Sequence, residues 1–315
     1  MPRVSIVTPA WKAAPYLRET YASVVAQTVT DWEWLVVDDG SPDDTGAILA
    51  ELAAADPRVK PLGDGTNRGA AGARNLGMAA ASAPFVALLD CDDRWAEDKL
   101  ELQLEYLDRN PSADGVCTWF ELFGDPHRIA QGVRLHPRGT VCTRDEALRG
   151  TTFLTSSLLV RRAVVEALGG MDEDPRLRSG QDYEYFFRMV SRFAIHRIHS
   201  VLTWWRVEPQ EGSLSASNRT HDNARGWRLL EVFLDKGLIT EEEAAVRRSF
   251  LHFEQGRNNL VYLDAPFRRH LVKSVLAGHA PNKALGILAL SWLPAPVLRP
   301  LLLGAQRAAK IVREG

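Results

Sequence analysis

Pro84-Phe85-Val86-Ala87-Leu88-Leu89-Asp90-Cys91-Asp92-Asp93 is an apolar run that ends in an acidic tetrad. The apolar run predicts a buried strand. In an extended segment the side chains of Asp90 and Asp92 would point the same way and converge on one divalent ion. Carboxylate ligands favour Mg²⁺ or Mn²⁺ over Zn²⁺, and a diphosphate commonly supplies the remaining ligands. A solvated acidic turn is the alternative interpretation, and Asp93 is interpreted as structural.

Strand and helix signals alternate around this segment throughout residues 1–110. Such alternation predicts an α/β fold with a doubly wound, mainly parallel sheet, in which ligands bind beyond the carboxyl ends of the strands. The expected strands are Val4–Thr8, Trp34–Val37, Val59–Leu62 and Phe85–Leu89, and the expected helices are Pro15–Gln27, Asp43–Ala55, Ala70–Ala81 and Trp95–Arg109.

The pattern is mixed after residue 110 and becomes helical beyond residue 216. The mixed part has strand signals at Val116–Phe123, Phe153–Val160 and Val201–Arg206, and helix signals at Arg161–Leu168 and Tyr183–Ser191. We therefore predict one domain over residues 1–215, with a change of pattern near residue 110. A helical extension is expected over residues 216–315.

Composition and charge limit the classes of function. The chain has 315 residues, of which 45% are apolar and 25% charged, as in ordinary globular proteins. Its net charge of −2 argues against a nucleic-acid partner. The three cysteines show neither a zinc pattern nor a disulfide framework, and a strand signal begins at Val4 with no preceding signal peptide. A cytoplasmic location is therefore expected.

The apolar segment 284–303 has two interpretations. It contains three prolines and Arg299, which argues against a membrane-spanning helix, and basic residues follow it. Residues 284–313 would then either lie at the inner face of a membrane as a peripheral contact or pack on the catalytic domain.

Three further segments carry polar side chains at the expected ends of strands and helices. In Asp38-Asp39-Gly40-Ser41 a carboxylate can accept a hydrogen bond from a base or ribose. The small residues of a second segment, Asn67-Arg68-Gly69-Ala70-Ala71-Gly72-Ala73-Arg74-Asn75, let a helix pack closely on the sheet or a ligand, and its two arginines could meet phosphate or base. The segment lacks the glycine spacing of the dinucleotide-binding fingerprint and of the P-loop. Asp182 stands at a helix start, as a cap or a general base. An ordinary turn and a tightly packed alanine helix remain the alternatives for the first two.

Two segments, one at the end of the last expected strand and one after it, complete the candidate site. Trp204-Trp205-Arg206-Val207-Glu208 offers aromatic faces for a sugar or base and a guanidinium for a diphosphate. Gly212-Ser213-Leu214-Ser215 follows it. A strand end packed on the core and a polar loop are the alternatives.

The order and spacing of these segments resemble the family 2 glycosyltransferases with the GT-A fold, over roughly residues 3–215. The resemblance implies a catalytic domain over residues 1–215, with a nucleotide-binding half (1–110) and an acceptor half (111–215). The resemblance implies that the backbone at Pro9 and Ala10 and the carboxylate of Asp39 hold a base, usually uracil. It places Arg74 near the nucleotide and Asp90 near the ribose. It assigns Asp92 to Mn²⁺ or Mg²⁺ on the diphosphate.

The acceptor side follows from the same resemblance. Asp182 is the implied catalytic base, and Gly169-Gly170-Met171-Asp172-Glu173 is similar to the acceptor loop, which assigns Asp172 and Glu173 to the acceptor. Trp205, Arg206 and Ser213 belong to a segment similar to the loop that closes over the diphosphate. The chain departs from the family at two positions: Gln181 stands where the family often has Glu, and Glu208 stands where it often has His. Glu208 is expected to be a second metal ligand.

The expected activity is inverting transfer of a sugar from a nucleotide-diphosphate donor, with UDP the expected nucleotide. The acceptor is expected to be a hydroxyl of a saccharide or of a lipid-linked acceptor in cell-envelope polysaccharide or glycoconjugate synthesis. The alternatives are a nucleotide-sugar-binding protein without turnover, a nucleotidyltransferase and an aspartyl phosphatase.

Overall fold

A computed structural model describes the chain except for residues 127–128, 130–138, 151, 209–223, 263–266 and 277–315. The chain divides into two compact units, Met1–Ala216 and Ser217–Gly315. The predicted membrane contact at residues 284–313 and the candidate residue Ser213 lie outside the described residues.

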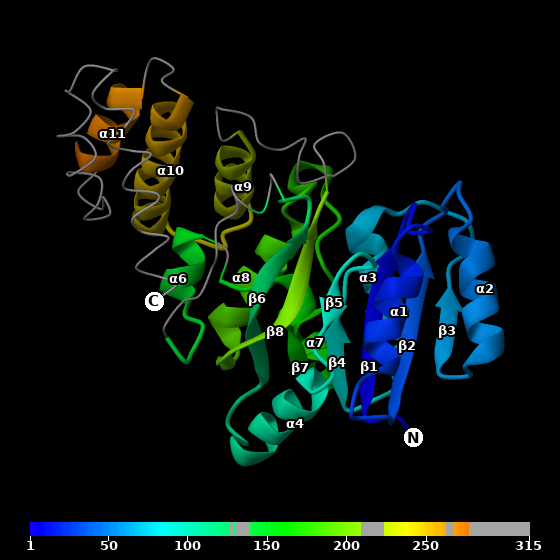
Figure 1. Ribbon diagram of the computed structural model, residues 1–315. Coiled ribbons are helices and arrows are strands. Elements are labelled where there is room, and N and C mark those ends of the chain that lie inside the picture. Colours follow the sequence, from blue (N-terminus) through cyan, green and yellow to red (C-terminus); the bar gives the residue numbers. More distant parts are fainter. Residues whose placement is uncertain (127–128, 130–138, 151, 209–223, 263–266, 277–315) are drawn as a thin grey trace. The chain divides into compact units, whose positions relative to one another are not determined.

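The first unit is built on one eight-stranded sheet with the order β3-β2-β1-β4-β7-β6-β8-β5 (Figure 1). Its strands are β1 (Val4–Ala10), β2 (Trp32–Asp38), β3 (Val59–Leu62), β4 (Phe85–Leu88), β5 (Arg94–Trp95), β6 (Gly115–Gly124), β7 (Leu159–Arg161) and β8 (Ile195–Val207). The pairs β1–β2, β2–β3, β1–β4 and β6–β8 are parallel, whereas β4–β7, β6–β7 and β5–β8 are antiparallel. The predicted mainly parallel α/β sheet is thus confirmed.

Helices cover both faces of this sheet. They are α1 (Leu17–Val25), α2 (Thr45–Ala55), α3 (Gly69–Ala80), α4 (Lys99–Arg109), α6 (Arg144–Arg149), α7 (Arg162–Leu168) and α8 (Gln181–Arg192). One core joins apolar residues of α1, α2 and α4 to alternate residues of β1, such as Val4 and Ile6. On the opposite face α3 packs closely on β1, because a Cβ at Gly77 would lie 2.5 Å from Val7. The hydroxyl of Tyr185 in α8 lies 3.7 Å from the sulfur of Met78 in α3.

Two predicted elements, the helix Trp95–Arg109 and the strand Phe153–Val160, are present but begin later than predicted. Trp95 was expected to begin a helix, but it lies in β5 and pairs with β8, and the helix begins at Lys99. The indole N–H of Trp95 donates to the carbonyl of Ser156 at 2.7 Å, which fixes the ring in the core. The predicted strand Phe153–Val160 instead contains a 3₁₀ turn at Thr155–Ser157, followed by β7.

Strand β8 begins at Ile195, earlier than the predicted start at Val201, and ends at Val207, one residue after the predicted end. Trp205 and Arg206 lie inside β8, as in the predicted strand Val201–Arg206, rather than in the loop that the resemblance implies for them. Helix α6 was not predicted, although Thr143 and Glu146 form a complete capping box that the sequence displays.

The second unit contains the predicted helices in its described part: α9 (Ala224–Asp235), α10 (Glu241–Tyr262) and α11 (Phe267–Leu276). The hydroxyl of Ser249 in α10 donates to the carbonyl of Ser274 in α11 at 3.0 Å. Of the helices in the described ranges, none has both the length and the apolar character needed to cross a bilayer.

Candidate active site

The turn after β2 is held against both β1 and the start of α3. The backbone N–H of Asp39 donates to the carbonyl of Ala10 at 2.8 Å, and the Asp39 carboxylate accepts from the N–H of Arg68 at 2.6 Å. Gly40 has φ +71°, and a Cβ there would lie 2.7 Å from the carbonyl oxygen of Gly65. The predicted base-binding residues Pro9, Ala10 and Asp39 therefore lie together at the carboxyl ends of β1 and β2.

Arg74 connects α3 to the acidic turn. Its side chain is 11% exposed and donates to the Asp90 carboxylate at 2.5 Å. Its Nε is buried without a hydrogen-bond partner among the described residues. Burial lowers the pKa of Arg74, but the charges of Asp90 and Asp182 outweigh this, so that its pKa is raised overall. Asp182, at the start of α8, thus lies within the electrostatic reach of the Arg74–Asp90 pair.

The tetrad is a turn rather than the extended segment expected. The N–H of Asp93 donates to the carbonyl of Asp90 at 3.1 Å, so the argument that Asp90 and Asp92 point the same way in a strand is wrong. Their charges nevertheless interact. Burial and the charge of Asp90 raise the pKa of Asp92 to about 7, and Glu208 adds to the increase.

Glu208 and Asp92 both lie close enough to the hydroxyl of Tyr16 to affect its pKa. Burial raises the pKa of Tyr16, and the charge of Glu208, with which its hydroxyl shares a hydrogen bond, raises it further, as does Asp92 to a smaller extent. The carboxylates of Asp92 and Glu208 therefore share a space where negative charge is poorly compensated, which fits a divalent cation. No group of three or more His, Cys, Asp or Glu side chains within the described ranges forms a complete ligand set.

Asp93 has the contacts of a structural carboxylate, as interpreted from the sequence. It is fully buried, accepts from the hydroxyl of Ser156 at 2.5 Å and accepts from the backbone N–H of Arg206 at 2.9 Å. Burial, with the charges of Asp92 and Asp90, raises the pKa of Asp93 well above its usual range. It joins the turn after β4 to the 3₁₀ turn and to β8.

The guanidinium of Arg206 is already engaged by the protein. Its Nε donates to the carbonyl of Asp92 at 2.9 Å, it pairs with Glu19, and it lies over the rings of Tyr16 and Phe123. Tyr16, which precedes α1, and Glu19, in α1, were not predicted as site residues, because nothing in the sequence of this segment marks them. Trp205 makes an edge-to-face contact with Phe120, with ring centroids 6.0 Å apart.

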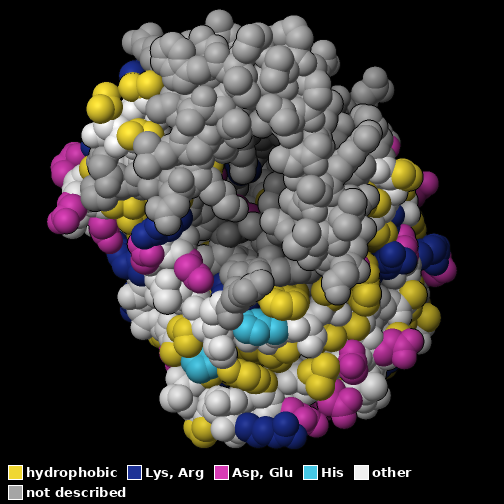
Figure 2. Space-filling model, turned by 60° about the vertical axis from the view of Figure 1, so that its left-hand side comes forward, with side chains coloured by type: hydrophobic (Ala, Val, Ile, Leu, Met, Phe, Trp, Pro, Cys, Tyr) yellow, Lys and Arg dark blue, Asp and Glu magenta, His cyan; other side chains and the backbone are white. Residues whose placement is uncertain are grey.

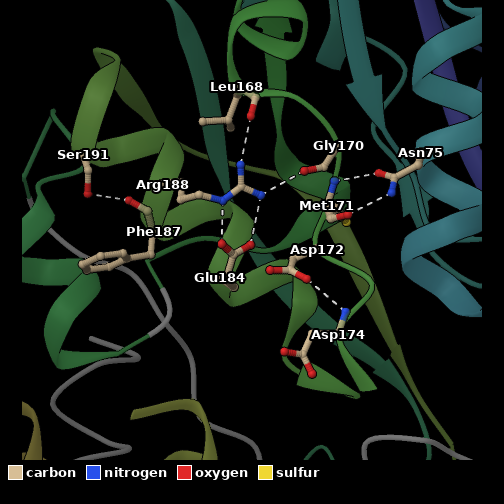
Figure 3. Close-up of polar contacts among 10 residues, drawn as sticks. All are labelled: Asn75, Leu168, Gly170, Met171, Asp172, Asp174, Glu184, Phe187, Arg188 and Ser191. Carbon is tan, nitrogen blue, oxygen red and sulfur yellow. Dashed lines mark hydrogen bonds and ion pairs between the residues drawn. The ribbon is translucent and has the colours of Figure 1, made fainter. Parts of the chain in front are cut away.

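The segment of the predicted acceptor residues follows α7 and leads to α8 (Figure 3). Asp172 accepts from the N–H of Asp174 at 3.0 Å, and Glu173 accepts from the side-chain amide of Asn75 at 2.8 Å. Asp182 accepts from the N–H of Tyr183 at 2.8 Å. Asn75 was part of a quoted segment but had no assigned role, and Arg188 was missed.

The surface agrees with the low net charge. On the face shown in Figure 2, Lys and Arg side chains lie among Asp and Glu side chains, and no area of one sign stands out among the described residues. The sequence-based argument against a nucleic-acid partner is unchanged by this view.

Two comparisons of sequence give the same family. The family model described as Glycosyl transferase family 2 matches residues 5–169, which is just over half of the chain. The putative teichuronic acid biosynthesis glycosyltransferase TuaG of Bacillus subtilis is 30% identical over 207 residues, 65% of this chain and 79% of that protein. The UDP-Glc:alpha-D-GlcNAc-diphosphoundecaprenol beta-1,3-glucosyltransferase WfgD of Escherichia coli is 41% identical over 107 residues, 34% of this chain and 42% of that protein.

Solved structures share the fold at low sequence identity. TarS 1-349 of S. aureus in complex with UDP-GlcNAc matches with a TM-score of 0.65 and 19% identity, covering 98% of this chain and 88% of that one. The mannosyltransferase PcManGT of Pyrobaculum calidifontis, in complex with GDP-Man and Mn²⁺, matches with a TM-score of 0.60 and 19% identity, covering 99% and 86%. The chain therefore belongs to glycosyltransferase family 2 and has the GT-A fold.

Proposed function

We propose that this glycosyltransferase transfers a sugar from a UDP-sugar to a hydroxyl of a lipid-linked saccharide in cell-envelope polysaccharide synthesis, with inversion at the anomeric carbon. The observation that carries the proposal is the convergence of Arg74, Asp90 and Asp182 from three elements at the carboxyl end of the sheet. The names of the relatives support the donor and acceptor, since WfgD uses UDP-Glc and a diphosphoundecaprenol-linked saccharide and TuaG is assigned to teichuronic acid.

The nucleotide would lie at the ends of β1 and β2. The backbone at Pro9 and Ala10 and the carboxylate of Asp39 would contact the base, and Asp90 the ribose. Asp90 is already oriented by Arg74, whose buried Nε has no partner among the described residues and can donate to a ligand. The bound UDP-GlcNAc of TarS supports a uracil nucleotide.

A divalent cation would be held by Asp92 and Glu208. Oxygen donors of this kind suit Mn²⁺ or Mg²⁺, and the Mn²⁺ of PcManGT supports this class of ion. When bound, the ion offsets the negative charge that develops on the leaving diphosphate. Such an ion would offset the burial and the charge of Asp90 that together raise the pKa of Asp92 to about 7.

Asp182 would be the general base. It accepts the proton of the acceptor hydroxyl while the hydroxyl oxygen attacks the anomeric carbon, and the bond from that carbon to the diphosphate oxygen breaks with its electrons leaving on UDP. One displacement inverts the configuration and requires no covalent enzyme intermediate. Asp172 and Glu173 would contact the acceptor, and a lipid anchor on the acceptor would account for the apolar segment 284–303.

A donor and metal panel tests this function. The protein is incubated with UDP- and GDP-sugars and a polyprenyl-diphosphate-linked saccharide, in Mn²⁺, Mg²⁺ or EDTA, and both glycoside and nucleotide products are measured. We expect equimolar glycoside and UDP, with loss of product in EDTA. Release of pyrophosphate would indicate a nucleotidyltransferase. A rise in melting temperature with a donor, without turnover, would indicate a binding protein.

A further inference from the structure

The segment Gly169–Asp174 is held from one side by Asn75 of α3 (Figure 3). The Asn75 amide nitrogen donates to the Met171 carbonyl at 2.8 Å, and its oxygen accepts from the Met171 N–H at 2.6 Å. The same nitrogen donates to the carboxylate of Glu173 at 2.8 Å. The side chain thus satisfies both backbone polar groups of one residue, as a neighbouring strand would.

The approach of this amide leaves no room for a side chain at Gly170. A Cβ there would lie 2.8 Å from Oδ1 and 3.0 Å from Nδ2 of Asn75. The second glycine of the segment is therefore required by a contact with α3, and not only by the end of α7.

Arg188 of α8 holds the segment from the other side. Its guanidinium donates to the carbonyls of Leu168 and Gly170, each at 2.9 Å, and forms a two-bond pair with Glu184 at 2.5 and 3.0 Å. Glu184 is 1% exposed, so this pair is firmly fixed in place. Figure 3 shows Arg188 and Asn75 reaching the segment from the two helices.

These two side chains stand beside groups of the active site. Asn75 follows Arg74, which binds Asp90, and Arg188 lies on α8, whose second residue is Asp182. We propose that Asn75 and Arg188 are positioning residues that hold Gly169–Asp174 between α3 and α8 and so set the position of Asp182 relative to the donor. The proposal rests on the proposed function, because it assigns the consequence to transfer from a bound donor.

The test separates positioning from mere stability through two reactions of the same donor. Asn75→Asp replaces a donor with an oxygen that faces the Met171 carbonyl and the Glu173 carboxylate. Arg188→Lys keeps the positive charge, but a single ammonium group cannot reproduce the guanidinium hydrogen bonds to the two carbonyls and to Glu184. We expect each variant to lower kcat for transfer about 10–100-fold, as a small misplacement of a reacting group does, while KM for the donor and the slow hydrolysis of donor without acceptor change less than about 2-fold.

Matched controls make the same chemical changes elsewhere. Asn110→Asp alters an amide at the end of α4, and Arg192→Lys alters an arginine of α8 that donates only to the Ala167 carbonyl among the bonds described. Both should keep the wild-type ratio of transfer to hydrolysis. Asn75→Ala, which adds no charge, gives a second variant should Asn75→Asp fail to fold.

Two results would overturn the inference. One is wild-type transfer in folded Asn75→Ala and Arg188→Lys, and the other is an equal loss of transfer and hydrolysis, which would mean that the residues support donor binding or the fold. Failure of the proposed function would appear instead in the wild-type protein, as an absence of transfer.

Discussion

The two sides of the proposed active site, which we call the nucleotide side and the acceptor side after their proposed ligands, are held in place by different kinds of contact. On the nucleotide side, Asp39 is fixed by its turn and by the neighbouring strand β1, through bonds to Ala10 and Arg68. On the acceptor side, the segment before Asp182 is held by Asn75, 96 residues away from Met171, and by Arg188. The nucleotide side is thus held by contacts at the edge of the sheet, whereas the acceptor side is held by a few side chains that contact residues distant in sequence.

The largest effect is expected at Asp182, on the acceptor side. Asp182→Asn keeps the shape of the side chain but removes its ability to take a proton, so transfer should fall ~10²–10⁴-fold. Steady-state transfer in a protein with wild-type donor binding measures this. A folded Asp182→Asn protein with near wild-type transfer would remove Asp182 from the mechanism.

Asp93 links the nucleotide-side turn to β8, and its loss should break that link. Asp93→Ala leaves the hydroxyl of Ser156 and the N–H of Arg206 buried without an acceptor. We expect this to lower the free energy of unfolding by about 2–4 kcal/mol. Denaturant unfolding measures the loss. Asp93→Asn should be much milder, because the raised pKa of Asp93 favours a neutral side chain. Equal losses in both variants would contradict this account.

Gly40 tests how tightly the turn after β2 is held. Gly40→Ala forces a left-handed conformation on alanine and places its Cβ 2.7 Å from the Gly65 carbonyl, so the free energy of unfolding should fall by about 2–3 kcal/mol. Gly65→Ala is the matched control, since Gly65 has φ +81° with no atom within 4 Å of a Cβ. It should cost about 1 kcal/mol, from conformation alone. The account fails if the two losses are the same.

The smallest effect is a pH dependence beneath the nucleotide side. Burial of Glu33 would raise its pKa, but hydrogen bonds from Lys60, Ser5 and Ser82 outweigh burial and lower the pKa from 4.5 to about 2. The unfolded chain therefore binds more protons between pH 4.5 and 2, and stability falls as the pH drops through that window. The contribution is on the order of 2 kcal/mol, allowing for screening at half-exposed Lys60. Glu33→Gln should flatten this part of the stability profile, and an unchanged slope would exclude Glu33.

The parallel half of the fold could be predicted because its signals are local. The apolar run before Asp90 is long and continuous, and β4 is buried at all four residues. Trp95 was misassigned because its place depends on pairing with β8, more than 100 residues later, which no local pattern displays. The start of β8 at Ile195, earlier than the predicted Val201, was missed for the same reason, since it is set by pairing with β6.

The site could be predicted only as a set of separate segments. Polar residues after buried strands mark the edge of a parallel sheet, which places Asp39 and Asp90 together. The proximity of Asp182 to Arg74 and the role of Asn75 depend on how α8 and α3 pack. Tyr16, just before α1, and Glu19, in α1, have Glu208 and Arg206 as neighbours, which lie more than 180 residues later in the chain.

Product stereochemistry tests the central claim most directly. The protein is incubated with an α-linked UDP-sugar and a polyprenyl-diphosphate-linked saccharide, and the anomeric proton of the product is observed by NMR while UDP is quantified. A single displacement assisted by Asp182 predicts a β-glycoside and one UDP for each sugar transferred. An α-glycoside, or UDP release that never yields a glycoside, would contradict the account.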